Sequence, residues 1–367
     1  MSITYSVTMI AALSLCSSCI PFQSVFLGHP DKKDAHRFPS NTIQAEKDCF
    51  QFKVANPKTE LRVNNWTHDQ PSFENLNTLC TNHAVRAFLV IQRDSLIFNY
   101  QSTNLAINQK HVSYSIAKSI VSCLIGIAID KGAIPSENST VIKWLPELSG
   151  TKFSDSLRIR HLLNHTSGIK PSIATDARLY YGRNLESEIE KTTFECAPGT
   201  KQKYLNINTE LLGILLSRAV GKSLSDFTRE YLWERIDMCE DALWSTDKKG
   251  MEKAFCCISA TAKDYAKFGR LYLNKGKWNG KTVFSEDWFN KTIRRDSTEG
   301  SSLNFNYSWH IGLQKYQDFM AIGLYKQHIY IYPEKEIIIV LLNNREDKLI
   351  AERVNWWNIF RQIGDQL

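Results

Sequence analysis

Hydrophobic and polar positions follow two different periods along the chain, which predicts strands near both ends and helices between them. Residues 84–92 (AVRAFLVIQ) and 96–101 (LIFNYQ) are rich in branched and aromatic side chains and flank a short polar turn, which is typical of a β-hairpin. Over residues 116–244 the apolar positions mostly recur with the helical period, and the run 208–221 ends at Gly221, a helix stop signal. Strand-like apolar runs return at 310–315, 321–326, 328–332 and 336–344, before an amphipathic helix over 348–364.

This order of elements predicts an α+β fold in which both ends of the chain build one antiparallel sheet. Helices flank that sheet, and an all-helical lobe of about residues 115–255 is inserted into it. We assign residues 71–367 to the folded domain. Residues 20–70 are polar, contain several prolines and few apolar runs, and are predicted to form an extended leader.

The first 30 residues contain no Asp, Glu, Lys or Arg, and an apolar stretch at 4–15 is followed by Cys16-Ser17-Ser18-Cys19. This pattern predicts a lipoprotein-type signal segment over residues 1–19, with cleavage before Cys19 and export to the periplasm or cell envelope. A lipid on Cys19 would tether the protein to a membrane. Left uncleaved, the segment would be a short anchor, because its apolar core falls below the ~20 residues of a spanning helix.

The composition is that of a globular protein, with 43% hydrophobic and 23% charged residues in a chain of 367. The formal net charge of +7 is spread along the sequence, which argues against a nucleic-acid partner. Seven of the nine cysteines lie beyond Cys19 with no regular spacing, so no disulfide framework is expected even in an exported chain. The adjacent Cys256 and Cys257 have no evident role in the sequence.

A lysine interrupts the apolar run HVSYSIAKSIVSCLIGIAID at residues 111–130, which predicts a buried helix. Lys118 follows Ser115 by three residues, so both side chains project from one helix face within about one turn. Burial lowers the pKa of a lysine, and a partly neutral amine can accept the proton of a neighbouring hydroxyl. The start of a helix also favours an oxyanion. From the helix alone, a lysine that snorkels to the surface is an equal alternative.

Other hydrolytic and metal-dependent chemistries find little support. The GxSxG element of α/β-hydrolases is absent. His161 and His165 have the spacing of two metal ligands on one helix, but no third ligand accompanies them, so helix packing and capping is the expected role. No metal or organic cofactor is predicted.

Four segments together resemble the serine β-lactamase and penicillin-binding-protein superfamily, in particular its class C-like branch of esterases, peptidases and 6-aminohexanoate-dimer hydrolases. Their joint order, spanning about residues 80–345, is more specific than any one of them. The segments are SYSIAKS (113–119), LRIRHLLNHTSGI (157–169), APGTKQKYLNINTELLGILLSRAVGKSL (197–224) and AIGLYKQHIYIYPEKEIIIVLLNN (321–344). The resemblance implies a β-lactamase/transpeptidase-like fold.

The resemblance also implies roles for residues of the first and third segments. Ser115 would be the nucleophile and Lys118 its base. Tyr204 matches the tyrosine of a Tyr-x-Asn element, whose phenol moves protons to the leaving group and from the deacylating water. We expect the neighbouring ammonium to lower the pKa of this phenol. Asn206 would bond to Lys118 or to the substrate carbonyl.

In the fourth segment the resemblance implies an oxyanion hole. The backbone N–H of Leu324 would complement that of Ser115, and Gly323 would permit the close approach. Lys326 stands where a glycine is usual, and together with Tyr325 it is expected to narrow the cleft or to contact the substrate. Lys-Thr-Gly and Lys-Ser-Gly are both absent, which argues against recognition of a penicillin-like carboxylate.

The sequence thus predicts an exported serine hydrolase that cleaves an ester or amide through an acyl-enzyme on Ser115. Its partners would be small-molecule esters, amides or short peptides. Two alternatives remain open at this point. One is a catalytically inactive protein that binds ligands through the same cleft, and the other is a D-alanyl peptidase or true β-lactamase.

Overall fold

The computed structural model describes residues 30, 34–46, 48–55, 60–67, 70–103, 105–106, 108–298, 300–343 and 354–367. The predicted signal segment, with Cys19, lies outside these residues. None of the helices within them has the length and apolar composition needed to cross a membrane.

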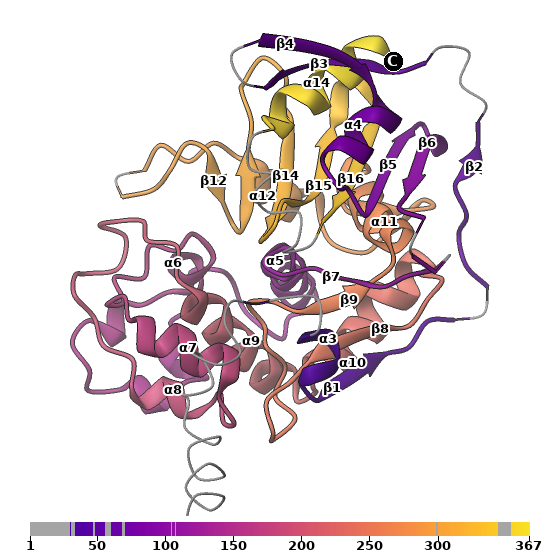
Figure 1. Ribbon diagram of the computed structural model, residues 1–367. Helices are drawn as coiled ribbons and strands as arrows, with labels where there is room; N and C mark the ends of the chain where they lie inside the picture. The colour runs from indigo at the N-terminus through magenta and orange to yellow at the C-terminus, as the bar shows by residue number, and fades with distance from the viewer. Residues whose placement is uncertain are drawn as a thin grey trace, which may run out of the picture.

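The largest element is an eight-stranded sheet to which both ends of the chain contribute, as the hydrophobic pattern predicts (Figure 1). The pairing of β16 with β5, in antiparallel register, joins the C-terminal strands to the N-terminal ones, and in this sheet only β2 runs parallel to its neighbour β6. In sheet order the strands are β12 (Phe305–Asn306), β13 (Trp309–Ile311), β14 (Phe319–Gly323), β15 (Gln327–Tyr332), β16 (Ile337–Leu342), β5 (Ala87–Gln92), β6 (Ser95–Gln101) and β2 (Lys53–Val54).

Both faces of this sheet are covered, which explains why β16 is apolar at every position. Ile338 and Val340 join the core beneath α11 (Ala262–Leu273), whereas Ile337 and Ile339 join a second core on the other face. Gly269 lets α11 approach closely, because a Cβ there would lie 2.7 Å from a methyl carbon of Ile338. The second face carries α14 (Trp356–Gln366), α4 (Leu76–Asn82) and the hairpin of β3 (Arg62–Thr67) and β4 (Gln70–Asn75).

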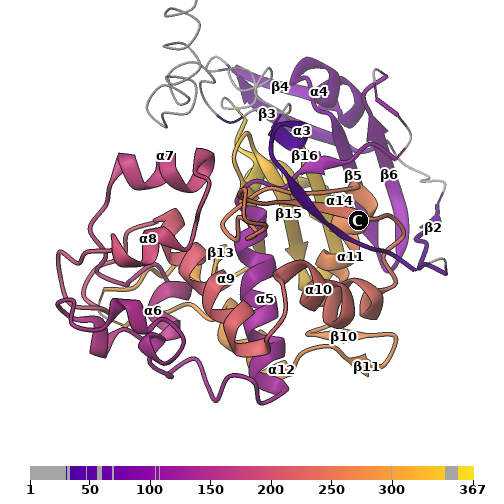
Figure 2. The same cartoon turned by 90° about the horizontal axis from the view of Figure 1, so that it is seen from below.

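The middle of the chain forms the predicted helical lobe. Gly221, in the left-handed conformation at φ 67°, ends α9 where the sequence predicts a stop. The helices of this lobe are α5 (Ile116–Asp130), α6 (Ile159–Leu163), α7 (Ile173–Tyr181), α8 (Ser187–Glu190), α9 (Asn206–Val220) and α10 (Leu224–Thr228). Figures 1 and 2 show α5 between the large sheet and the rest of the lobe, beside α9.

Shorter elements complete the fold. They are the helix α12 (Glu286–Ile293), the β10–β11 hairpin (Lys277–Trp278 and Lys281–Thr282), the 3₁₀ turns Val141–Lys143, Pro146–Leu148, Ser154–Ser156, Glu234–Ile236 and Pro333–Lys335, and the π-helical turn Arg229–Trp233.

A second, four-stranded antiparallel sheet ties the predicted leader to the domain. Its strands are β1 (Ser40–Ile43), β8 (Ala242–Ser245), β9 (Ile258–Ala260) and β7 (His111–Val112). The leader also supplies α3 (Asp34–Arg37), β2 and β3, so much of it is integrated into the fold. These segments are too short to show a clear period, and they become strands because partners distant in sequence offer backbone hydrogen bonds. His111–Val112 is a strand for the same reason, although the sequence places it in the α5 helix.

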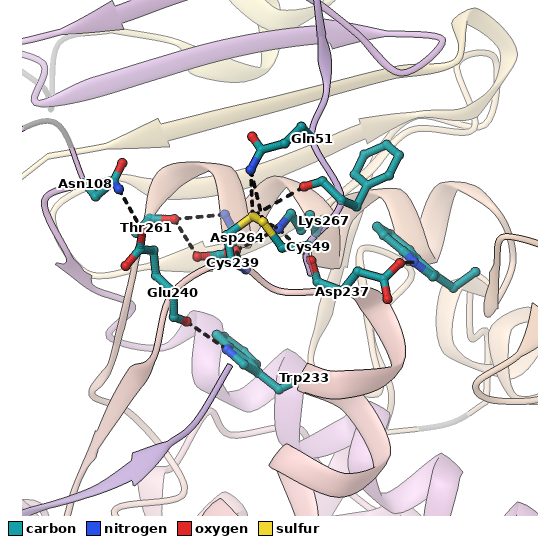
Figure 3. A network of polar contacts seen from close by, with 12 residues as sticks. Cys49, Gln51, Asn108, Trp233, Asp237, Cys239, Glu240, Thr261, Asp264 and Lys267 are labelled. Atoms are coloured by element: carbon teal, nitrogen blue, oxygen red, sulfur yellow. Dashed lines mark hydrogen bonds and ion pairs between the residues drawn. A yellow bond between two sulfur atoms is a disulfide. The ribbon is translucent and has the colours of Figure 1, made fainter. Parts of the chain in front are cut away.

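Two disulfides join cysteines within the described residues, and one of them links the leader to the domain, so the expectation of no disulfide framework is wrong. Cys49, just after β1, pairs with Cys239, and the adjacent Cys256 and Cys257 pair with each other. The first bond crosses 190 positions of sequence, a relation that no spacing pattern could indicate. Figure 3 shows it in a polar network that includes Asp264 and Lys267, two residues of α11.

Candidate active site

The start of α5 brings Ser115 and Lys118 together, as their spacing predicts. Ser115 is the N-cap residue of this helix, and Lys118 is 1% exposed. The Lys118 amine donates to Ser115 Oγ at 3.0 Å, to Asn206 Oδ1 at 2.9 Å and to the Phe255 carbonyl oxygen at 2.8 Å. All three acceptors are uncharged, so no carboxylate fixes the proton on this amine.

Burial lowers the pKa of Lys118 to about 7, and this effect outweighs the opposing charges of Asp176 and Glu210. A group with this pKa is populated in both protonation states near neutral pH. The amine can therefore accept the Ser115 proton and return it elsewhere.

Tyr204 completes a triangle with these two residues. Its ring stacks on His165 with centroids 4.5 Å apart, and the Lys118 amine lies 5.0 Å from the ring centroid. The phenol also forms a hydrogen bond with the Ser115 side chain. Although 49% of Tyr204 is exposed, burial around its hydroxyl raises the pKa to about 12, and the bond to Ser115 only partly offsets this. The expected lowering by the lysine is therefore wrong, and the phenol keeps its proton at neutral pH.

His165 and His161 serve structure at this site. The His165 Nδ1 atom accepts the backbone N–H of Leu205 at 3.1 Å, and burial lowers the pKa of His165 to about 3, so its ring is a neutral platform under Tyr204. The His161 Nδ1 atom accepts the backbone N–H of Arg158 at the start of α6, the predicted capping role. Within the described ranges no group of three or more His, Cys, Asp or Glu side chains could hold a metal ion.

Asn206, the first residue of α9, has a fixed amide orientation. Its Nδ2 donates to Asp176 Oδ1 at 3.1 Å, which leaves Oδ1 to accept from Lys118. Burial raises the pKa of Asp176, against the opposing effects of Asn206 and Lys118. This carboxyl group therefore acts on the lysine through the amide between them, a connection that the sequence analysis missed.

The β14–β15 hairpin approaches the nucleophile closely. A Cβ on Gly323 would lie 2.3 Å from the Ser113 carbonyl oxygen, so only glycine permits this contact. Leu324 follows, 41% exposed, at the edge of the pocket above Ser115. Lys326 has φ 64°, a left-handed conformation that glycine would adopt more readily than lysine.

Tyr325 lies elsewhere than the sequence analysis expects. It is 6% exposed and packs edge-on against Tyr114 with ring centroids 5.3 Å apart, and its hydroxyl donates to the Pro30 carbonyl oxygen. It therefore fastens the N-terminal segment to the hairpin, and it is absent from the residues lining the pocket over Ser115.

A pocket of about 460 Å³ opens above the nucleophile. Its lining is mostly apolar and consists of Ser115, Gln202, Tyr204, Phe305, His310, Ile322, Gly323 and Leu324. Burial lowers the pKa of His310 to about 4, so no lining side chain that the structure describes is charged at neutral pH. The sequence does not predict four of these lining residues, because nothing in their local pattern distinguishes them from packing residues: Gln202, Phe305, His310 and Ile322.

Known proteins resemble this chain in sequence and in fold. The sequence profile of the family described as Beta-lactamase matches residues 87–362. The 6-aminohexanoate-dimer hydrolase of Paenarthrobacter ureafaciens is 24% identical over 300 residues, which cover 75% of this chain and 75% of that protein. A Bacillus anthracis structure described as a 6-aminohexanoate-dimer hydrolase superposes with a TM-score of 0.79 at 22% identity, covering 91% of this chain and 93% of that one. A class C β-lactamase gives a TM-score of 0.59 at 18% identity, with 78% and 93% covered. The predicted fold class is therefore confirmed.

Proposed function

Because this chain belongs to the beta-lactamase family and is a serine hydrolase, we propose that Ser115 attacks the carbonyl carbon of a small amide or ester and is acylated. The observation that carries this proposal is the 3.0 Å contact between the Ser115 hydroxyl and a buried amine whose pKa is about 7. Water then hydrolyses the acyl-enzyme and regenerates the serine.

Two groups move the protons. Lys118 accepts the Ser115 proton as the oxygen attacks, since its amine is partly neutral near pH 7. Tyr204, which holds its proton at this pH, donates it to the leaving nitrogen or oxygen and recovers a proton from the Lys118 ammonium. In deacylation the same transfers run in reverse, with water in place of the leaving group.

The developing oxyanion would lie between two backbone N–H groups, those of Ser115 and Leu324. The helix start at Ser115 and the close approach of Gly323 to Ser113 support this arrangement. Losing one such donor typically raises the barrier by about 3 to 4 kcal/mol. Asn206 holds the lysine in place, and its amide is engaged by Lys118 on one side and Asp176 on the other.

The pocket favours substrates that are uncharged near the scissile bond. No lysine or arginine is among the described residues that line it, so a carboxylate on the acyl group would lack a cationic partner among them. Phe305, Ile322 and Leu324 offer an apolar surface to the acyl chain. A neutral amide or ester with an apolar acyl group therefore fits better than a penicillin-like acid.

A fluorophosphonate probe tests the proposal directly. Wild-type protein should become labelled and Ser115→Ala should not, and equal labelling of both would reject Ser115 as the nucleophile. A panel of neutral esters, amides, the 6-aminohexanoate dimer and a chromogenic cephalosporin then ranks the substrates. Preferred turnover of the cephalosporin would instead support a β-lactamase, and ligand binding without any turnover would support an inactive binding protein.

We also propose that the protein is exported and tethered through Cys19. The uncharged N-terminal segment and the two disulfides support this, because disulfides persist in oxidising compartments. Fractionation of cells that make the full chain should find it with membranes, and Cys19→Ser should release it. Recovery of both forms in the cytosol would contradict the proposal.

A further inference from the structure

One turn, residues 253–258, contacts both the lysine of the site and the strand that leads into its nucleophile. The Phe255 carbonyl oxygen accepts from the Lys118 amine at 2.8 Å. Three residues later, the Ile258 N–H donates to Ser113 Oγ at 3.0 Å, and the Ser113 N–H donates to the Ile258 carbonyl at 2.6 Å. The path of this turn therefore sets the distance between an acceptor of Lys118 and the backbone next to the nucleophile.

The Cys256–Cys257 disulfide lies inside the turn, directly after Phe255. Both cysteines are buried, and Cys257 has φ 72°, a left-handed conformation that residues with a side chain rarely adopt. A covalent link between neighbouring side chains removes most of the backbone freedom of the pair. The disulfide can therefore keep Cys257 in the left-handed conformation, which residue 257 of an unlinked pair would rarely adopt.

Neighbouring groups bind several other polar atoms of the turn. Trp244 Nε1 donates to the carbonyls of Lys253 and Cys256 at 3.0 and 3.1 Å. The Ala254 N–H donates to Glu210 Oε2 at 2.9 Å, and the Ser245 N–H donates to the Cys257 carbonyl at 3.1 Å. These contacts fix the backbone of the turn on both sides of Phe255, so that the Phe255 carbonyl points at the Lys118 amine.

We propose that the Cys256–Cys257 disulfide is a positioning element of the acyl-transfer site, which holds the Phe255 carbonyl against Lys118 so that the amine faces Ser115. This inference rests on the proposed function. A lysine side chain has large rotamer freedom, and a fixed acceptor selects one orientation of its amine. Misplacing a catalytic group by about 1 Å can cost up to 10²-fold in rate.

The presence of the bond is tested first. Denatured, unreduced protein is treated with iodoacetamide and digested, and the peptide with Cys256 and Cys257 should carry no label and be two hydrogens lighter than the dithiol. Labelling of both cysteines would overturn the proposal. Cys80, Cys123 and Cys196, which are free in the structure, should be labelled in the same sample.

Two variants then separate positioning from mere stability. Cys256→Ser/Cys257→Ser removes the bond and keeps side chains that disfavour the left-handed conformation. We expect kcat/KM at pH 7 to fall about 10-fold or more, and the acid limb of its pH profile to move to higher pH. A loosened turn admits water to the lysine and weakens the burial that lowers its pKa. The other titratable groups around this amine are Asp176 on α7, Glu210 on α9, His165 and Tyr204.

Cys256→Ala/Cys257→Gly also lacks the bond, but glycine readily adopts the conformation of residue 257. This variant should recover most of the activity and the wild-type pH profile. A purely structural role would instead lower the thermal stability of both variants and leave both profiles unchanged. That outcome, in variants shown to be folded by near-UV circular dichroism, overturns the inference, and so does a profile of the Ala/Gly variant as shifted as that of the Ser/Ser variant.

Cys49→Ser/Cys239→Ser is the matched control. It removes the other disulfide, which lies near α11 and contacts none of the site residues (Figure 3). We expect lower stability with an unchanged pH profile. Fluorophosphonate labelling of the wild type is measured beforehand, so an unlabelled wild type refutes the proposed function, whereas a labelled wild type with indifferent Cys256 and Cys257 variants refutes only the positioning role.

Discussion

Two buried lysines in this protein share a local geometry but differ in their partners. Lys118 on α5 and Lys267 on α11 are each 1% exposed. Each amine donates to the side chain three residues before it, Ser115 Oγ at 3.0 Å or Asp264 Oδ1 at 3.1 Å. Burial is the largest cause of a lowered pKa in both.

The difference lies in what surrounds each amine. Lys267 faces a carboxylate, the Asp237 carbonyl and the Cys239 sulfur, all inside the network of Figure 3. Lys118 faces a hydroxyl, an amide and a carbonyl, below an open pocket. A carboxylate stabilises the ammonium and fixes its proton, whereas neutral acceptors leave the proton free to move. Burial alone therefore does not make a lysine a base. The chemical nature of the groups that accept from its amine decides whether the amine can exchange its proton.

The largest expected effect is on activity. Lys118→Met should lower kcat/KM by about 10³-fold, within the range for removal of an acid–base group. Lys267→Met should retain wild-type turnover per folded molecule, because the hydrogen bonds of this amine go to Asp264, Asp237 and Cys239, none of which is a described lining residue of the pocket. Steady-state kinetics on the best ester substrate measure both variants, with fluorophosphonate labelling to count active molecules. Comparable losses in the two would show that the two buried lysines are not distinguished by their partners.

For stability, we expect the opposite order, with a larger loss of unfolding free energy in Lys267→Met than in Lys118→Met. Lys267→Met leaves Asp264 with 0% exposure and no ammonium, and breaking a buried ion pair in this way costs about 3 to 5 kcal/mol. Lys118→Met removes a partly charged group from a site of neutral acceptors and should cost less. Urea unfolding at pH 7 compares the free energies of unfolding, and Lys267→Met/Asp264→Asn should recover part of the loss. A larger loss in Lys118→Met would contradict the assignment of charge.

The sequence predicts the Lys118 site much better than the Lys267 site. Lys118 stands out because it interrupts an apolar run that must be buried, and its serine partner has a chemistry of its own. Lys267 lies in an amphipathic segment with other charged residues, where an exposed lysine is the ordinary expectation. The contact between Lys118 and the Phe255 carbonyl could not be predicted, because every residue has a backbone carbonyl and the identity of residue 255 does not show that its carbonyl is used.

The same contrast holds for the fold. Strands such as β5 and β16 are long and apolar enough to be recognised locally, whereas β1 and β7 form only because β8 and β9 lie beside them. The β14 strand shows the intermediate case. Its apolar run predicts a strand to residue 326, but the chain turns after Gly323. Tyr325 and Lys326 have left-handed conformations there, which the residue types Tyr and Lys do not predict.

A charge-conserving exchange can make the Lys118 site resemble the Lys267 site. In Asn206→Asp/Asp176→Asn, the carboxylate moves to the position 2.9 Å from the amine, and the hydrogen bond between residues 176 and 206 is retained. An adjacent carboxylate should raise the pKa of Lys118 by about 1 to 3 units. The acid limb of kcat/KM then moves upward by the same amount, so activity at pH 7 falls while activity near pH 9 recovers.

Asp176→Asn alone is the control for that exchange. It removes a charge that raises the pKa of Lys118, so its acid limb should move slightly to lower pH. The opposite displacements of the two variants distinguish an effect of charge from an effect of damaged packing. Identical profiles for the exchange variant and the wild type would show that the partner of Lys118 does not control its proton.

The smallest expected effect is on how stability depends on pH. The pKa of Lys118 is about 7 in the folded protein and returns towards 10.5 on unfolding, so the unfolded chain binds more protons between these values. The free energy of unfolding therefore rises with pH across this window, by up to about 1.4 kcal/mol per pH unit from this group. The contribution is complete above pH 10.5 and is lost as the pH falls towards 7.

Urea unfolding at pH 7, 8 and 9 should show a shallower rise in the free energy of unfolding for Lys118→Met than for the wild type. The wild type and Lys267→Met should differ less in slope, because Asp264 opposes the lowering of the Lys267 pKa. Parallel curves for the wild type and Lys118→Met would mean that the amine of Lys118 stays charged in the folded protein, and the distinction between the two lysines would then fail.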